Sequence, residues 1–215
     1  MTIRAKLYTA IVVAVAGLAL TVGVGISAMS TLGRHFDRVQ AASDAQALAL
    51  QLKFDITDFN GWQTAYGYDD GKSRPLYLAA FARFRTNLGR ARSALARPQE
   101  VRELDRIESA TNDFDALDGK AWAALGAGRQ AEVRRLFLGP EIVNFHRAAA
   151  AAQALADYEN ARTAREDAAF RDARSDALRL LVLASIVTAL FIVILLVTAV
   201  DLARTAERAL AKRSI

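Results

Sequence analysis

Two long apolar runs flank a charged middle region in this chain of 215 residues. The second run, residues 180–200, contains no charged residue, no Pro and no Gly. As a helix it would extend for roughly 31 Å, which matches the hydrocarbon core of a bilayer. A helix of this length in the core of a soluble protein would carry a polar stripe. Residues 180–200 are therefore predicted to form a transmembrane helix.

The first apolar run, residues 7–29, is also uncharged and follows Arg4 and Lys6. The apolar region of a secretory signal peptide usually has about 7–15 residues, and this run is longer. We therefore favour an uncleaved signal anchor over a cleaved signal peptide. The run predicts a second transmembrane helix.

Small residues recur at four-residue spacing within the first run, at Ala10 and Ala14 and then at Gly17, Thr21 and Gly25. Such spacing lets two helices approach closely in lipid. The partner could be a second copy of the chain or the other membrane helix. The pattern is also compatible with the ordinary Gly and Ala content of a membrane helix.

The region between the two runs has helical periodicity throughout and no β pattern. Helices are predicted from residue 30 to about 69, 73 to about 96, 98 to about 125 and 130 to 138, and from Glu141 without a breaker into the second apolar run. Ser73 is expected to cap the second of these, and Gly71 to end the first in a left-handed conformation. The predicted fold is all-α, with two transmembrane helices flanking an extracytoplasmic antiparallel four-helix bundle of up-down-up-down order.

Positive charges near the chain ends set the predicted topology. The segments are a cytoplasmic N-terminus at 1–6, a transmembrane helix at 7–29, an extracytoplasmic four-helix-bundle domain at 30–179, a transmembrane helix at 180–200 and a short basic cytoplasmic tail at 201–215. The predicted location is a membrane that the chain crosses twice, with both termini in the cytoplasm. The tail is expected to lie on an anionic lipid surface.

Composition excludes several classes of chemistry. The chain has no Cys, which excludes a thiol nucleophile and a disulfide framework. Its two histidines, His35 and His146, have no ligand partner at helical spacing, and no phosphate loop, nucleophile motif or paired carboxylates occur. We therefore expect no enzyme activity, no catalytic residues, no cofactor and no metal. The net charge of +5 is spread among acids, so no nucleic-acid partner is expected.

Other charged groups are expected to be solvated. Two groups of acids lack the loop spacing of a calcium site and are predicted to face solvent: Asp69, Asp70, Asp113, Asp115 and Asp118. One face of the second helix carries Arg83, Arg85, Arg90 and Arg92. That face is either solvated or a site for an acidic ligand.

The best candidate for a ligand site lies near the end of the first long helix. Trp and Tyr combine a large buried area with a polar group, and polar residues at i, i+3 or i+4 share a helix face. Small-molecule sites are apolar hollows with a few convergent polar groups. The candidate ligand-binding residues are Asp58, Asn60, Trp62, Gln63 and Tyr66. Alternatively, Trp62 and Tyr66 only fill the core.

Two stretches also carry a family resemblance. The segment Asp58–Tyr66 is similar to part of the first bundle helix in many actinobacterial chemoreceptor-like proteins, and Gly126–Ala131 is similar to the entry of a late bundle helix in the same family. With the order of membrane and helical segments, residues 1–200 resemble the sensor region of bacterial methyl-accepting chemotaxis proteins. The resemblance implies a bacterial plasma membrane as the location and a sensor role for the domain at 30–179. After residue 200 no HAMP-like segment is recognisable, so kinase control and methylation are not implied.

The predicted function is that of a chemoreceptor-like sensor module, which detects an extracytoplasmic signal and transmits it through a continuous helix, without its own output domain. The expected partners are the lipid bilayer, a second copy or a related receptor in a mixed dimer, and a small-molecule or periplasmic protein ligand. A second protomer is expected to complete the half of the bundle nearer the membrane, where each chain supplies two helices. The alternatives are a non-sensing structural or interaction membrane protein and a fragment of a longer receptor.

Overall fold

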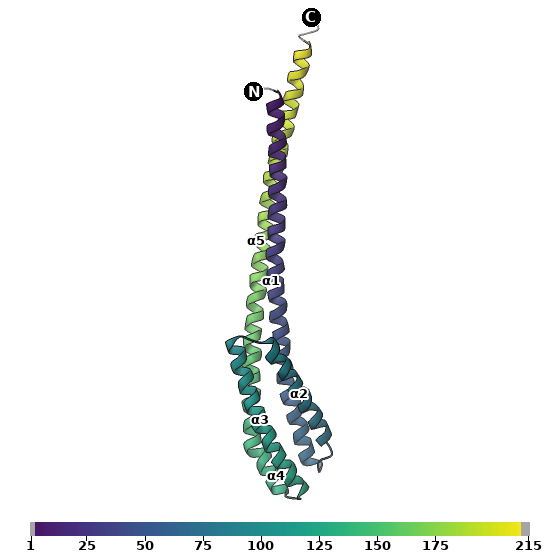
Figure 1. Ribbon diagram of the computed structural model, residues 1–215, viewed down its shortest axis with the longest axis vertical. Helices are drawn as coiled ribbons and strands as arrows, with labels where there is room; N and C mark the ends of the chain where they lie inside the picture. Colours follow the sequence, from purple (N-terminus) through teal and green to yellow (C-terminus); the bar gives the residue numbers. More distant parts are fainter. Residues whose placement is uncertain (1–2, 212–215) are drawn as a thin grey trace. The chain divides into compact units, whose positions relative to one another are not determined.

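The computed structural model describes residues 3–211, and every regular element in that range is helical. The elements are α1 (Ile3–Tyr68), α2 (Arg74–Ala94), α3 (Pro98–Gly126), α4 (Gln130–Leu136), a π-helical turn η1 (Phe137–Glu141) and α5 (Ile142–Ala211) (Figure 1). The all-α prediction is confirmed for this range. The predicted terminal segments reach residues 1–2 and 212–215, which lie outside the described residues.

Local signals explain where the helices end. The chain leaves α1 through Asp70 and Gly71, whose φ angles are 57° and 85°, and the Gly71 N–H donates to the Tyr66 carbonyl at 2.9 Å. This left-handed ending follows the expectation for Gly71. Ser73 does not cap α2 through its side chain. Its hydroxyl instead donates to the Asp69 carboxylate at 2.5 Å, so Ser73 stabilises the turn between the two helices.

The later helices also begin and end at breakers. Pro98 is the first residue of α3, and the Glu100 carboxylate accepts a hydrogen bond from the Arg97 backbone N–H at 2.8 Å. Gly128 lies in the middle of the connection between α3 and α4, with a φ of 70°. Gly139 departs from helical geometry, with φ and ψ of −110° and −106°, and Pro140 follows it. As predicted, α5 then continues without interruption.

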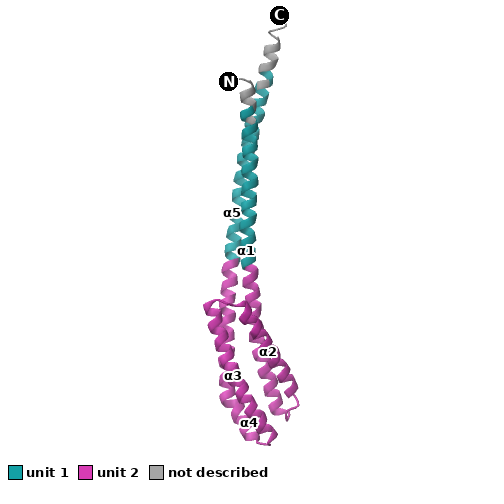
Figure 2. Cartoon of the chain, in the orientation of Figure 1, with its two compact units in different colours: residues 1–38, 167–215 teal, residues 39–166 magenta. Residues whose placement is uncertain are grey.

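The chain divides into two compact units, residues 39–166 and residues 1–38 with 167–215 (Figure 2). In the unit of residues 39–166, parts of α1, α2, α3 and α5 share one hydrophobic core. Phe59 lies at its centre, with its ring 5.1–5.3 Å from the rings of Phe81, Phe84 and Phe114 in edge-on arrangements. Edge-to-face aromatic pairs add to the energy of area burial, by about 0.5–1.5 kcal/mol each.

In the other unit, the apolar part of α1 packs against the apolar part of α5. The hydroxyls of Thr21 and Thr188 are 2.7 Å apart, and the Thr188 hydroxyl also lies 3.3 Å from the Gly17 carbonyl oxygen. A Cβ atom at Gly17 would lie 3.1 Å from the Phe191 ring. Gly17 and Thr21 of the small-residue pattern thus contact the second apolar run of the same chain.

Two helices are long and apolar enough to cross a membrane, α1, which contains the first apolar run, and α5, which contains the second. Few side chains in either apolar segment are buried within the protein. Large apolar side chains are exposed along both, including Leu18, Ile26, Leu183 and Leu190. The predicted boundaries at residues 29 and 180 describe the edges of a bilayer and stay predictions.

Candidate functional site

A cavity of about 170 Å³ lies where the end of α1 meets α4, η1 and the start of α5. We name it the Glu141 pocket. Its wall combines apolar side chains with a few polar groups, and is formed by Asn60, Gln63, Thr64, Gly67, Tyr68, Val133, Arg134, Phe137, Leu138, Glu141 and Ile142. All of these residues belong to the unit of residues 39–166.

Glu141 is the buried charged group of this pocket, with 1% of its surface exposed. Its Oε2 atom accepts a hydrogen bond from Gln63 Nε2 at 2.5 Å. Its Oε1 atom is buried and has no hydrogen-bond partner among the described residues. A buried polar atom left without a hydrogen bond costs about 1–3 kcal/mol, so Oε1 is an unfavourable feature of the structure as it stands.

Asp118 on α3 lies behind Gln63 and connects three elements of the fold, α1, α2 and α3. Its Oδ1 atom accepts hydrogen bonds from the Tyr66 hydroxyl and, at 3.3 Å, from Gln63 Nε2. Its Oδ2 atom forms an ion pair with Arg74 Nη1 at 2.6 Å. Gln63 therefore links Glu141 in the pocket to Asp118 and to the first turn of α2.

Arg74 is held within a group of aromatic rings. Its guanidinium carbon lies 4.8 Å from the ring centres of Tyr66 and Tyr77 and 4.9 Å from that of Trp122. Cations at such distances are attracted by the ring quadrupoles. The Tyr66 ring also packs edge-on against Phe137, which lines the pocket. Side chains behind the pocket are therefore fixed by both charge and packing.

Burial shifts the protonation of these groups. It raises the pKa of Glu141 to about 8, and the negative charge of Asp118 adds to the rise, while the hydrogen bond from Gln63 and the charge of Arg74 oppose it. Burial likewise raises the pKa of the Tyr66 and Tyr77 hydroxyls, with a further contribution from Asp118. At neutral pH the Glu141 carboxyl is therefore largely protonated and can release its proton when a ligand binds.

The structure separates the five residues predicted from the sequence. Asn60 and Gln63 line the Glu141 pocket. Tyr66 is fully buried behind it. Asp58 and Trp62 line a different, shallow hollow of about 380 Å³ on the α1 surface. The candidate residues thus do not form one site.

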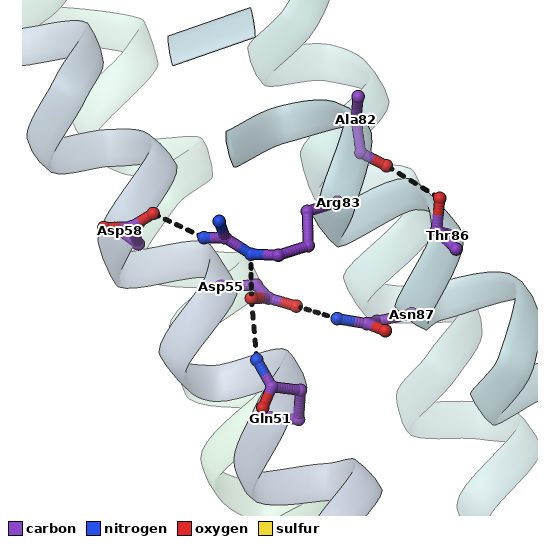
Figure 3. A network of polar contacts seen from close by, with 7 residues as sticks. All are labelled: Gln51, Asp55, Asp58, Ala82, Arg83, Thr86 and Asn87. Atoms are coloured by element: carbon purple, nitrogen blue, oxygen red, sulfur yellow. Dashed lines mark hydrogen bonds and ion pairs between the residues drawn. The ribbon is translucent and has the colours of Figure 1, made fainter. Parts of the chain in front are cut away.

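Asp58 has a structural partner on α2, as Figure 3 shows. Its Oδ2 atom forms an ion pair with Arg83 Nη2 at 2.6 Å. Arg83 Nε also contacts Asp55 Oδ1 at 3.2 Å, and Asp55 accepts a hydrogen bond from Asn87 at 2.7 Å. Asp55 is fully buried, so this network fixes the register between α1 and α2.

Two expectations about charged side chains change. The expectation that Asp118 is a solvated acid is wrong, since it is 1% exposed and paired with Arg74. The arginine face of α2 is partly neutralised by the chain itself. Arg85 pairs with Asp115, and Arg92 pairs with Asp105 and Glu108, in addition to the Arg83 pairs.

Arg74, Tyr77, Asp118 and Glu141 belong to the site but were not among the residues predicted. A signal for Asp118 was present, because it follows Phe114 by four residues and precedes Ala121 by three, in register with buried positions of α3. A charged residue at such a position needs a partner. Nothing comparable identified Glu141, which follows the break at Gly139 and Pro140.

A second buried acidic group lies at the other end of α2 and α3. Glu100 and Glu159 are both nearly fully buried, and Arg162 Nη1 contacts Glu100 at 3.2 Å and Glu159 at 3.0 Å. Burial, followed by the neighbouring Glu100, raises the pKa of Glu159 to about 7. These residues line none of the cavities described above and join α3 to α5.

The site thus contains an apolar cavity with one unsatisfied carboxyl oxygen, supported by a polar and aromatic layer. No protein-family model, curated protein or solved structure matches the chain.

Proposed function

We propose that the chain is a membrane-anchored sensor module that binds a small molecule in the Glu141 pocket. One observation carries the proposal: the pocket is built mainly from the last turns of α1 and from η1 with the first residue of α5. These are the two helices that contain the apolar runs. A ligand in this pocket contacts the ends of both.

The break at η1 makes this position suited to transmit a change. A helix interrupted by a π-turn, a non-helical Gly and a Pro has fewer internal hydrogen bonds to break than a regular helix. Glu141 lies directly before Ile142, the first residue of α5. A ligand that changes the position of Glu141 acts on the start of a helix that runs to Ala211. This is the signalling route proposed here.

The proposal includes the finer architecture expected from the sequence. The two apolar runs cross a bacterial plasma membrane, and the helices between them form an antiparallel four-helix bundle outside the cell, as in the chemoreceptor sensor regions that the chain resembles. The shared core of α1, α2, α3 and α5 and the exposed apolar surface of the two runs support this arrangement. In water such surface would be costly, at about 25 cal/mol per Å².

A second protomer is part of the proposal. Leu50 and Phe54, one helical turn apart on α1, are 49% and 59% exposed. They are candidates for the contact with a second copy or a related receptor. Sedimentation of the chain in detergent should give a dimer, which Leu50→Glu with Phe54→Glu would dissociate, and a monomer at micromolar wild-type protein would contradict this part.

Topology can be tested with single cysteines, because the chain contains none. Cysteine at Asp157, an exposed position of α5, should react with a membrane-impermeant maleimide added to intact cells. Cysteine at Arg204, also exposed, should react only after lysis. Equal labelling of both positions before lysis would exclude the proposed topology.

Sensing can be tested with a disulfide between positions 21 and 188, whose hydroxyls are 2.7 Å apart. In membranes, a small molecule that raises the melting temperature of the full chain should change the rate of oxidation of the Thr21→Cys, Thr188→Cys variant. Adding Thr64→Phe, which places a large ring at an exposed position of the Glu141 pocket wall, should remove that change. A stabilising ligand that leaves the oxidation rate unaltered would favour a non-sensing membrane protein.

A further inference from the structure

The geometry points to a small organic ammonium ion, a protonated amine with a compact apolar body, as the ligand of the Glu141 pocket. The inference rests on the sensor function proposed above, since it names the ligand class of the same site. It depends on the state of one carboxyl oxygen, the size and surface of the cavity, and the charged groups around it.

Glu141 Oε1 is the atom that requires a partner. Its neighbour Oε2 is already occupied by Gln63, and the carboxyl group is almost fully buried. Oε1 has no donor from any described residue, although the group lines the cavity. An N–H donor placed in the cavity would satisfy Oε1 and add charge pairing, and hydrogen bonds to charged groups contribute about 1.5–3 kcal/mol.

The remaining wall favours an apolar body on the ligand. Val133, Phe137, Leu138 and Ile142 supply aliphatic and aromatic surface. The volume of about 170 Å³ is similar to cavities of about 150 Å³ that hold benzene. The matching ligand therefore has about six to eight non-hydrogen atoms, by comparison with that case.

Charged and polar groups approach Glu141 from each of the helices packed around it. Asp118 on α3 adds negative potential at Glu141. The positive charge of Arg74 on α2 opposes this effect, but Arg74 is already paired with Asp118. Two neutral donors come from α1: Gln63 donates to the Glu141 carboxyl group and Tyr66 donates to the Asp118 carboxyl group. Arg134 on α4 also lines the cavity and is exposed to solvent, which screens its charge.

Binding of an ammonium ion should be coupled to proton release. At pH 7 the Glu141 carboxyl is largely protonated in the free protein, because its pKa lies at about 8. The bound cation favours the carboxylate, so the carboxyl proton passes to the buffer while the ammonium keeps its own protons. Affinity should therefore rise as pH increases from 6 to 8, a range in which an alkylamine stays charged.

The test uses the full chain in nanodiscs and three ligands of nearly equal shape: benzylamine, benzyl alcohol and benzoate. Titration calorimetry at pH 7 should show benzylamine binding at least tenfold more tightly than benzyl alcohol, with no binding of benzoate. Repeating the titration in buffers of different ionisation enthalpy should show about one proton released per amine bound.

Two variants and a control separate charge from shape. Glu141→Gln keeps the size of the side chain and should remove both the preference for the amine and the proton release. Thr64→Phe should abolish binding of amine and alcohol alike. Asp157→Asn removes an exposed carboxylate of α5 outside the pocket and should leave all three affinities unchanged.

Two results would overturn the inference: equal affinity of the native chain for benzylamine and benzyl alcohol, or an amine preference that survives in Glu141→Gln. Failure of the sensor function would give a different result. In that case benzylamine would bind with the expected preference, while the oxidation rate of the Thr21→Cys, Thr188→Cys variant would not respond to it.

Discussion

Asp118 is the side chain on which the layer behind the pocket depends. One carboxylate on α3 accepts from Tyr66 and Gln63 of α1 and pairs with Arg74 of α2. The carboxylate is buried, and the Arg74 side chain is 14% exposed. Taking two charges out of water is costly unless their remaining hydrogen-bonding groups are satisfied, and here they are largely satisfied.

Replacing Asp118 with Asn should therefore destabilise the protein by about 3–5 kcal/mol, because it leaves Arg74 buried without a counter-charge. Chemical denaturation followed by circular dichroism measures this loss. The matched control is Asp113→Asn on the same helix, whose ion pair with Arg147 is more than half exposed on both sides. Its effect should stay within about 1 kcal/mol. A loss of the same size in both variants would show that Asp118 has no special role.

Glu141 and Glu159 predict an unusual dependence of stability on pH. Both pKa values are raised by burial, to about 8 and about 7. As pH rises above the ordinary glutamate range, the unfolded chain loses protons that the native state keeps, so stability is full at low pH and is lost up to about pH 8. Each group contributes at most about 1.4 kcal/mol per pH unit.

Equilibrium unfolding of the native chain between pH 5 and pH 8 should show this fall. Glu141→Gln should reduce the slope over the whole window, whereas Glu159→Gln should reduce it mainly below pH 7. The double variant should be nearly independent of pH in this range. A native chain whose stability rises from pH 5 to pH 8 would contradict both assignments.

Helix α1 shows how far the sequence specifies the structure. Its periodicity and the breaker at Asp70 and Gly71 are local signals, so its end at Tyr68 could be predicted to within a residue. Which of its polar side chains meet a ligand could not, because that depends on partners far along the chain. Gln63 lines the Glu141 pocket and its neighbour Trp62 does not, because Gln63 faces Glu141, which is 78 residues away.

Two glycines near the end of α1 can be used to test which face of the helix contacts η1. A Cβ atom at Gly67 would overlap the Phe137 ring, whereas a Cβ at Gly61 would meet nothing within 4 Å. Gly61→Ala should therefore raise the stability by up to about 1 kcal/mol, the intrinsic helix preference of Ala. Gly67→Ala should displace Phe137 from the pocket wall, lower the stability and weaken ligand binding. Thermal melts and titration with benzylamine measure both effects, and equal behaviour of the two variants would show that α1 and η1 are not in close contact.

The two units of the chain have different kinds of contact between helices. In the unit of residues 39–166, large side chains such as Phe59, Phe84 and Leu155 fill a shared core. In the other unit, the α1 and α5 contacts involve the small side chains Gly17 and Thr21, with large apolar groups directed outward. Small contact residues with apolar surroundings are typical of helices that associate in lipid. This contrast supports the proposal that the two apolar runs lie in a membrane.

The contact between Thr21 and Thr188 can also be used to test whether the small residues of α1 pack against α5 of the same chain or against a second copy. In membranes, oxidation of the Thr21→Cys, Thr188→Cys variant should form a disulfide within one chain. On a non-reducing gel the product should migrate differently from the reduced chain but still as a monomer. Val22 is half exposed beside Thr21, so Val22→Cys with Thr188→Cys should oxidise several-fold more slowly. Gly17→Leu should slow the first reaction, because the added side chain meets Phe191. A product of twice the chain mass in place of the intrachain disulfide would assign this face to a second copy and leave α5 to pair elsewhere.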